Sequence, residues 1–219
     1  PQPPAPPPLQ PTPPSPQPTP PPPAQPQPPK EKAAPPVSII RVDKQTVYEI
    51  SATQEVKSVV GEALKRESPL HALESVDFFI ANERFLSLSE ITQALGLSIP
   101  DGLLQTLEPS YTFFRFSQKE EGRLGFVAKI KDAAALTQQA ASWEKTIVED
   151  SEQFFALLGK QANKGPFKQA SWKGVSFRYY DFLPEKLGIV YAIHPAQNLF
   201  IFTSSGESML DVVNRIELK

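Results

Sequence analysis

The chain contains no cysteine, and only two of its 219 residues are histidine. The lack of cysteine excludes disulfides, cysteine-zinc sites and thiol catalysis. The two histidines, His71 and His194, lie far apart, and neither has a second histidine at the ligand spacing of a helical metal site. No apolar run approaches the ~20 residues that a membrane-spanning helix needs. The sequence therefore predicts no metal site and no cofactor.

Motifs of several enzyme classes are absent or incomplete. No Gly-x-Ser-x-Gly elbow is present. Ser142 and Lys145 have the Ser-x-x-Lys spacing of penicillin-binding enzymes, but they fall late in an expected helix, and the Lys-Thr-Gly companion is missing. Residues 159–165 lack the Walker spacing of a phosphate-binding loop. We therefore predict no catalytic residue and a protein that is not an enzyme.

Proline, in contrast, is concentrated at one end, because 20 of the 26 prolines lie in residues 1–36. This segment has almost no large apolar side chains, so it cannot bury a core. We expect a disordered, polyproline II-like spacer that extends about 110 Å at about 3.1 Å per residue. The alternative is a docking site for a proline-reading domain, since PxxP recurs many times. Most of the segment, however, lacks the basic residue that commonly orients such ligands.

Residues 37–219 have the size of a single globular domain. They carry 20 lysines and arginines against 23 aspartates and glutamates. Nucleic-acid binding depends on clustered positive charge, so this mildly acidic balance predicts no nucleic-acid partner. The sequence begins at Pro1 rather than methionine, and we expect an upstream segment that could carry a signal or a membrane anchor.

Apolar runs bounded by polar turns predict strands. They cover residues 37–42, 46–51, 75–81, 111–116, 123–131, 174–182, 187–193 and 199–204. Apolar residues at helical spacing predict helices. They cover residues 56–64, capped by Ser51 or Thr53; 68–74; 86–96, ending at Gly96; 99–109; 133–147, capped by Asp132 and extending as far as 159; and 204–216, with a capping box of Ser204 and Glu207.

Short connections between these elements favour an α+β fold, with helices packed on an antiparallel or mixed sheet. Leu124, Phe126, Ala128 and Ile130 share one face of their strand, which we expect to be packed. The face that carries Arg123 and Lys129 is expected to be wetter.

Two runs, residues 78–95 and 199–216, share the order strand, polar turn, helix. This similarity suggests that the domain is built from two related halves, residues 37–108 and 109–219.

Residues 141–158 carry a Trp143-Glu144 pair late in a helix, then Asp150, then Phe154 with Phe155. With this signature, with residues 35–45 and with residues 199–216, the chain resembles uncharacterised single-pass membrane-anchored envelope proteins of candidate-phylum bacteria, over roughly Val37 to Lys219. In that family, proline-rich tracts and one membrane span commonly precede the domain. The resemblance implies an extracytoplasmic, membrane-anchored domain, and it carries over no catalytic residues.

No acidic residue occurs between Gln153 and Tyr180, and basic and aromatic residues alternate there. Such a surface can hold an anionic polymer or a sugar by charge and stacking. The predicted ligand-surface residues are Lys160, Lys164, Lys168, Trp172, Lys173 and Arg178. The alternative is that the aromatic residues face the core and the lysines are solvated.

We therefore expect a non-catalytic, extracytoplasmic binding or structural domain that is displayed on the spacer and contacts another envelope protein or an anionic wall polymer. One alternative is an enzyme that acts on envelope polymers through an unrecognised site. The other is a cytoplasmic adaptor whose proline tract is itself the ligand.

Overall fold

The chain divides into two units, residues 1–31 and 32–219. The computed structural model describes residue 2 and residues 34–81, 83–119, 121–159, 165–182 and 186–217. Most of the expected spacer lies outside these ranges. Pro36 already contacts the domain, because its carbonyl accepts a hydrogen bond of 2.9 Å from Gln45 Nε2.

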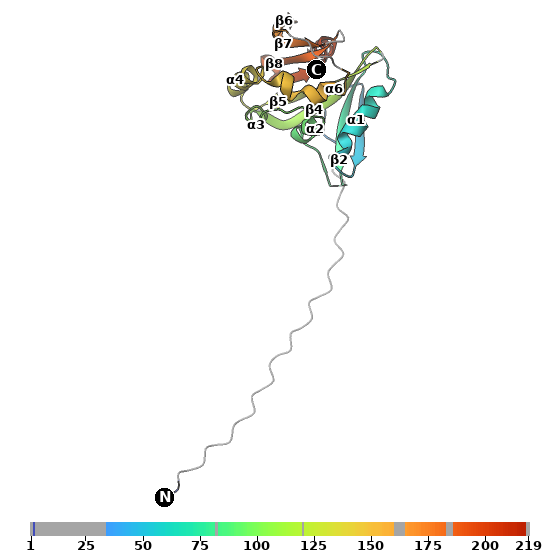
Figure 1. The fold of residues 1–219 in the computed structure, drawn as a ribbon, viewed down its shortest axis with the longest axis vertical. Coiled ribbons are helices and arrows are strands. Elements are labelled where there is room, and N and C mark those ends of the chain that lie inside the picture. The colour runs from blue at the N-terminus through green and yellow to red at the C-terminus, as the bar shows by residue number, and fades with distance from the viewer. Residues whose placement is uncertain are drawn as a thin grey trace. The chain divides into compact units, whose positions relative to one another are not determined.

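The described part of the second unit is built on one mixed sheet of nine strands (Figure 1). The strands are β1 (Lys44–Ile50), β2 (Leu73–Ile80), β3 (Arg84–Phe85), β4 (Leu107–Gln118), β5 (Glu121–Ile130), β6 (Lys168–Trp172), β7 (Val175–Phe182), β8 (Leu187–His194) and β9 (Leu199–Thr203). Their order is β1-β2-β4-β5-β9-β8-β7-β6, and β3 pairs with β2. Only the β1–β2 pair among these strands is parallel. The predicted α+β fold with a mixed sheet is confirmed.

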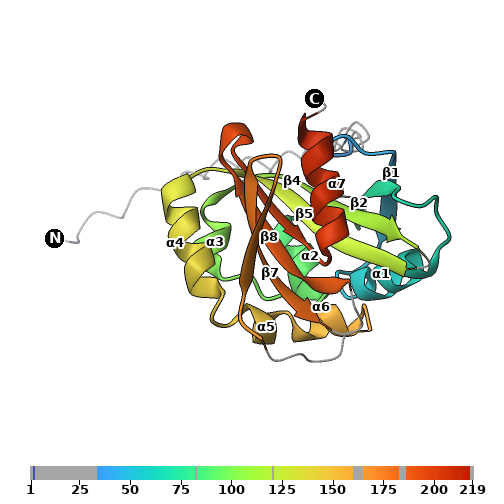
Figure 2. The ribbon, with the colours of Figure 1, turned by 90° about the horizontal axis from the view of Figure 1, so that it is seen from above.

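Helices cover the two faces of this sheet unequally. They are α1 (Glu55–Lys65), α2 (Leu88–Ala94), α3 (Asp101–Leu104), α4 (Ala133–Trp143), α5 (Ile147–Asp150), α6 (Glu152–Ala156), the 3-10 turn η1 (Pro195–Gln197) and α7 (Gly206–Glu217). Buried side chains of α1 to α6 belong to one apolar cluster. Those of α7 belong to the other, together with Ile40. Figure 2 looks onto the face that α7 covers, with α2 and α3 behind the strands.

The β4–β5 hairpin shows that both faces of the sheet are packed. Phe126 belongs to the cluster under α1 to α6, whereas Phe114 and Val127 belong to the cluster under α7. The expected wetter face is therefore only partly wet: Lys129 is exposed, but Arg123 is buried at 4% exposure. The sequence pattern predicts a solvated face here, but α7 lies across this face and excludes solvent from most of it.

Gly125 marks the closest approach inside this hairpin. A Cβ at this position would lie 2.5 Å from Phe114 Cζ and 2.6 Å from the carbonyl oxygen of Phe202. The second contact is with backbone, which cannot rotate away as a side chain can. Because Gly125 has no side chain, β5 can pack closely between β4 and β9.

Several local predictions hold. Asp132 Oδ1 accepts from the Ala135 amide at 3.0 Å and caps α4. The expected stripe of that helix is buried, with Leu136, Ala140, Trp143 and Ile147 at 0–3% exposure. Gly96 has φ of +80° just beyond α2, as expected of a helix terminator.

Four helical predictions are wrong in detail. The helix expected over residues 99–109 is only the short α3, and β4 already begins at Leu107. Residues 68–74 do not form a helix; Leu73 begins β2, where it is fully buried and opposite Phe116, so packing outweighs local preference. The long helix after Asp132 breaks into α4, α5 and α6. The side chain that caps α7 is that of Ser205, which accepts from the Ser208 amide at 3.2 Å.

Corrections also apply to strands and to another cap. Residues 37–42 form no strand, although Ile40 is buried against the α7 face of the sheet. Gln54 occupies the cap position of α1 and makes no side-chain capping bond, so neither Ser51 nor Thr53 has the expected role. The edge strand β6 was not expected from the sequence. The related-halves hypothesis stays a prediction; the helices of its two runs, α2 and α7, lie on opposite faces.

Candidate functional site

The predicted ligand-surface residues do not share one face of the sheet. Lys160 and Lys164 lie outside the described residues. In the β6–β7 ladder, Lys168 lies opposite Tyr179 and Gln169 lies opposite Arg178. Since opposed residues point to the same side and neighbours to opposite sides, Lys168 faces α7 and Arg178 faces the other layer.

Arg178 is engaged in a structural ion pair. Its Nε and Nη2 donate to the two carboxylate oxygens of Glu144 at 2.6 and 2.8 Å, and the hydroxyl of Tyr191 donates to the same carboxylate. These bonds from Arg178, followed by that from Tyr191, lower the pKa of Glu144 despite its partial burial. The arrangement ties the end of α4 to β7 and β8.

The other residues of the helical signature have a similar role. Trp143 Nε1 donates to Asp150 Oδ2 at 3.0 Å, and the Thr146 hydroxyl donates to the same oxygen at 2.7 Å. Together with the Glu144 ion pair, these bonds fix the break between α4 and α5. The residues of this signature therefore have a structural role at the junction between α4 and α5.

The remaining predicted residues lie on or beside β6. Trp172 is 42% exposed and donates from Nε1 to Asn214 of α7 at 3.2 Å. Lys168 Nζ lies 3.1 Å from Asp181 and 5.6 Å from the ring centre of Tyr179. Lys173, with φ of +48°, forms the β6–β7 turn with Gly174. The structure thus brings Lys168 and Trp172 onto the α7 face and leaves Arg178 on the opposite face.

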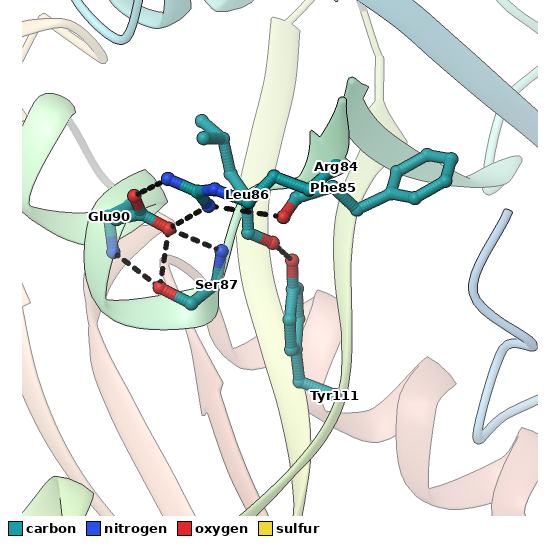
Figure 3. A network of polar contacts seen from close by, with 6 residues as sticks. All are labelled: Arg84, Phe85, Leu86, Ser87, Glu90 and Tyr111. Atoms are coloured by element: carbon teal, nitrogen blue, oxygen red, sulfur yellow. Dashed lines mark hydrogen bonds and ion pairs between the residues drawn. The ribbon is translucent and has the colours of Figure 1, made fainter. Parts of the chain in front are cut away.

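One hollow in the described residues is a groove of about 780 Å³ between residues 36–39, 84–87 and 109–111. We call it the β3–β4 groove. A polar network lies beside it (Figure 3). Arg84 donates to both carboxylate oxygens of Glu90 at 2.9 and 2.6 Å, and Ser87 and Glu90 form a capping box at the start of α2. The Tyr111 hydroxyl donates to the Leu86 carbonyl.

These polar groups satisfy one another. The bonds from Arg84 lower the pKa of Glu90 to about 2, with further help from Ser87. Burial raises the pKa of Tyr111, and the nearby charges of Asp77 and Glu90 add to the shift. A network in which the carboxylate and the hydroxyl already have partners holds β3, α2 and β4 together. We therefore assign it a structural role.

Another hollow, which we call the α7 pocket, has a volume of about 330 Å³ and lies at the N-terminal end of α7. Its apolar wall comes from three neighbouring strands: Ala170 of β6, Phe177 and Tyr179 of β7, and Val190 of β8. Part of this wall belongs to the basic, aromatic segment singled out in the sequence. The aromatic residues of that segment therefore contribute to a hollow, and the charges beside them do not form one surface.

Gln118, the last residue of β4, lines the α7 pocket. It has the same strand parity as Phe114 and Phe116, which pack under α7. Its side chain is only 2% exposed, and neither Oε1 nor Nε2 has a hydrogen-bond partner among the described residues. Most buried polar side-chain atoms in proteins are hydrogen-bonded, so this amide is exceptional.

Charged groups surround the pocket. Asp181 is paired with Lys168 at 3.1 Å, and Glu207 Oε1 lies 2.7 Å from His71 Nε2. Lys186 also lines the pocket and has no ion-pair partner in the described part of the chain. Its φ of +75° is uncommon for a residue with a side chain.

Backbone donors lie at the same place. Gly206 and Glu207 begin α7 and line the pocket. No acceptor for either amide occurs among the described residues, whereas the next amide, that of Ser208, is capped by Ser205. The first amides of a helix are without intrahelical acceptors and carry partial positive charge.

Sequence reasoning did not find this pocket. Gln118 falls in the polar stretch between the strands expected over residues 111–116 and 123–131, and the other residues that line the pocket come from β6, β7, β8 and α7 or lie beside them. The one available signal was the run of aromatic residues that supplies Phe177 and Tyr179.

Within the described ranges, no three histidine, aspartate or glutamate side chains form a group that could hold a metal ion, and no helix is long and apolar enough to cross a membrane. No protein-family model, curated protein or solved structure gives a match to this chain. The assignment of a site therefore depends on the geometry described above.

Proposed function

We propose that residues 32–219 form a non-catalytic binding domain and that the α7 pocket is its binding site. The observation that carries this proposal is Gln118, a buried amide whose two polar atoms have no partner among the described residues. Such a group costs about 1–3 kcal/mol of stability. The presence of such a costly group is explained if the amide hydrogen-bonds to a ligand.

The chemistry of the lining supports binding rather than catalysis. The polar side chain deepest in the wall, Gln118, is neither an acid nor a base. The two carboxylates, those of Asp181 and Glu207, are held by Lys168 and His71. The volume is at the lower end of the range for ligand pockets, so the group that enters is small and largely apolar.

The wider role that we propose is contact with another component of a cell envelope. The proline-rich composition of residues 1–36 suits a spacer that holds a domain away from a surface. The resemblance to membrane-anchored envelope proteins supports the same location. In this proposal the domain is displayed outside the cytoplasmic membrane, and the α7 pocket receives a group carried by its partner.

Binding can be tested with three probes that share one alkyl chain: hexanoate, hexanamide and hexylamine. The full chain, isotopically labelled at methyl groups, is titrated with each probe and followed by NMR. At least one probe should shift the methyl signals of Ala170 and Val190, which line the pocket, in a saturable manner. Gln118→Met, which keeps the shape but removes both polar atoms, should weaken that binding.

The matched control is Ser75→Ala. Ser75 is also 2% exposed and has an unpartnered hydroxyl, but it lines neither hollow. Its substitution should leave probe binding unchanged. Saturable shifts from none of the three probes, or equal binding by Gln118→Met and the parent, would overturn the proposed function.

A further inference from the structure

We infer that the ligand of the α7 pocket is a carboxylate attached to an apolar body. This inference rests on the proposed function and names the chemical class of the ligand. It follows from the donors that converge on the pocket, from the state of the acidic groups around it and from its apolar wall.

The donors come from three separate parts of the chain. Gln118 of β4 offers an unpartnered Nε2, and the first amides of α7, those of Gly206 and Glu207, have no acceptor among the described residues. Lys186 adds an ammonium group. Amides at a helix N-terminus favour negative charge through both their hydrogen bonds and the helix dipole. An anionic group with two oxygens can accept from several of these donors together.

Both carboxylates that line the pocket already have a partner. Asp181 is paired with Lys168, and Glu207 contacts His71, and neither Lys168 nor His71 itself lines the pocket. Lys186 has no such partner in the described residues. The cation that lines the pocket is therefore available to a ligand.

The rest of the ligand must be apolar. The ring of Phe177 and the aliphatic side chains of Ala170 and Val190, which belong to or pack against the cluster under α7, form the wall. Phe177 and Val190 are buried, so the site is built from the core of the sheet. A phosphate or another fully polar anion would leave this wall uncovered, whereas a carboxylate with a short hydrocarbon body would cover it.

Two sources supply this chemistry. One is a small free carboxylic acid. The other is the C-terminal carboxylate of a polypeptide whose last residue is apolar, a group that proteins capture with backbone amides. Both place one carboxylate against the start of α7 and one apolar group against the wall.

The probe titration described above distinguishes the classes. Hexanoate should bind about tenfold more tightly than hexanamide, because hydrogen bonds to a charged group are stronger than neutral ones. Hexylamine should bind more weakly still. Lys186→Gln should weaken hexanoate binding about fivefold and leave hexanamide binding unchanged. The charge-matched control is Lys57→Gln, on an exposed position of α1, which should change neither.

A second pair of probes identifies the source. Acetyl-Gly-Gly-Leu with a free carboxylate is compared with the same peptide ending in an amide. If the free peptide binds and the amidated one does not, the carboxylate and its polypeptide source are both supported. Binding of hexanoate with no binding of either peptide supports the carboxylate and assigns it to a small free acid.

The outcomes separate the two levels of the proposal. Binding of hexanamide or hexylamine at least as tight as that of hexanoate would overturn the carboxylate while leaving a binding pocket. Unchanged hexanoate affinity in Lys186→Gln, with hexanamide binding equally well, would do the same. A failure of all three alkyl probes would instead overturn the proposed function itself.

Discussion

Replacing Gln118 by methionine should make the domain more stable and at the same time impair binding. The parent side chain is 2% exposed, and both of its polar atoms have less than 1 Å² of accessible surface and no partner in the described residues. Burial without hydrogen bonds costs about 1–3 kcal/mol. Methionine has a similar unbranched shape and no strong polar group, so it removes this cost without leaving a cavity.

The expected gain can be converted into a melting temperature. For domains of about 150–250 residues, 1 kcal/mol corresponds to about 2–4 °C. Gln118→Met should therefore raise the melting temperature by about 2–12 °C. Thermal unfolding followed by circular dichroism measures this shift, and urea unfolding gives the free energy independently, provided that the slope with denaturant stays constant.

Ser75→Ala serves as the control for the stability measurement as well. It removes an unpartnered buried hydroxyl from the same face of the sheet, so it should be neutral or stabilising, with probe binding intact. A lower melting temperature for Gln118→Met would mean that the amide has a partner that stabilises the fold. That result would refute the argument that Gln118 is kept for a ligand.

Three further outcomes follow from the packing and the ion pairs. Trp143→Ala should cost about 3–5 kcal/mol in urea unfolding, and Trp143→Phe, which loses the indole hydrogen bond and part of the ring but keeps an aromatic ring in the core, should cost less; equal losses would contradict the importance of ring burial. Gly125→Ala should cost about 1–3 kcal/mol, since its Cβ would lie 2.6 Å from the Phe202 carbonyl oxygen; an unchanged melting temperature would show that the strands can separate at no cost. Because the pKa of Glu90 is lowered from 4.5 to about 2, its contribution to stability is complete above pH 4.5 and is lost as the pH falls toward 2. The melting temperature of Glu90→Gln should therefore fall less steeply over that window, and parallel curves for variant and parent would count against the shift.

Local patterns in the sequence predicted the elements whose stability depends on residues close together in the chain. Asp132 caps α4 because its carboxylate reaches an amide three residues on, and the spacing of Leu136, Ala140 and Trp143 places all three on one buried stripe. Residues 187–193 and 199–204 are apolar on both faces, which is typical of internal strands, and β8 and β9 are internal strands of the sheet. Capping and periodicity depend on residues a few positions apart, so they can be recognised without a fold.

Other features depended on which segments meet in space. Leu73 begins a strand rather than belonging to a helix because it packs opposite Phe116. Arg178 resembled a free cation in the sequence, yet Glu144 from α4 holds it on the face away from α7.

The composition of the chain by itself determined a proline-rich segment joined to a mildly acidic domain without cysteine chemistry, and the order of its apolar runs predicted the α+β fold. Only the tertiary structure decided where that domain has a candidate site. The α7 pocket joins Gln118 of β4, the wall of β6 to β8 and the first amides of α7. These groups become neighbours through long-range strand pairing. The lack of a partner for a buried amide is a property of its three-dimensional surroundings, and no pattern of residue types along the chain records it.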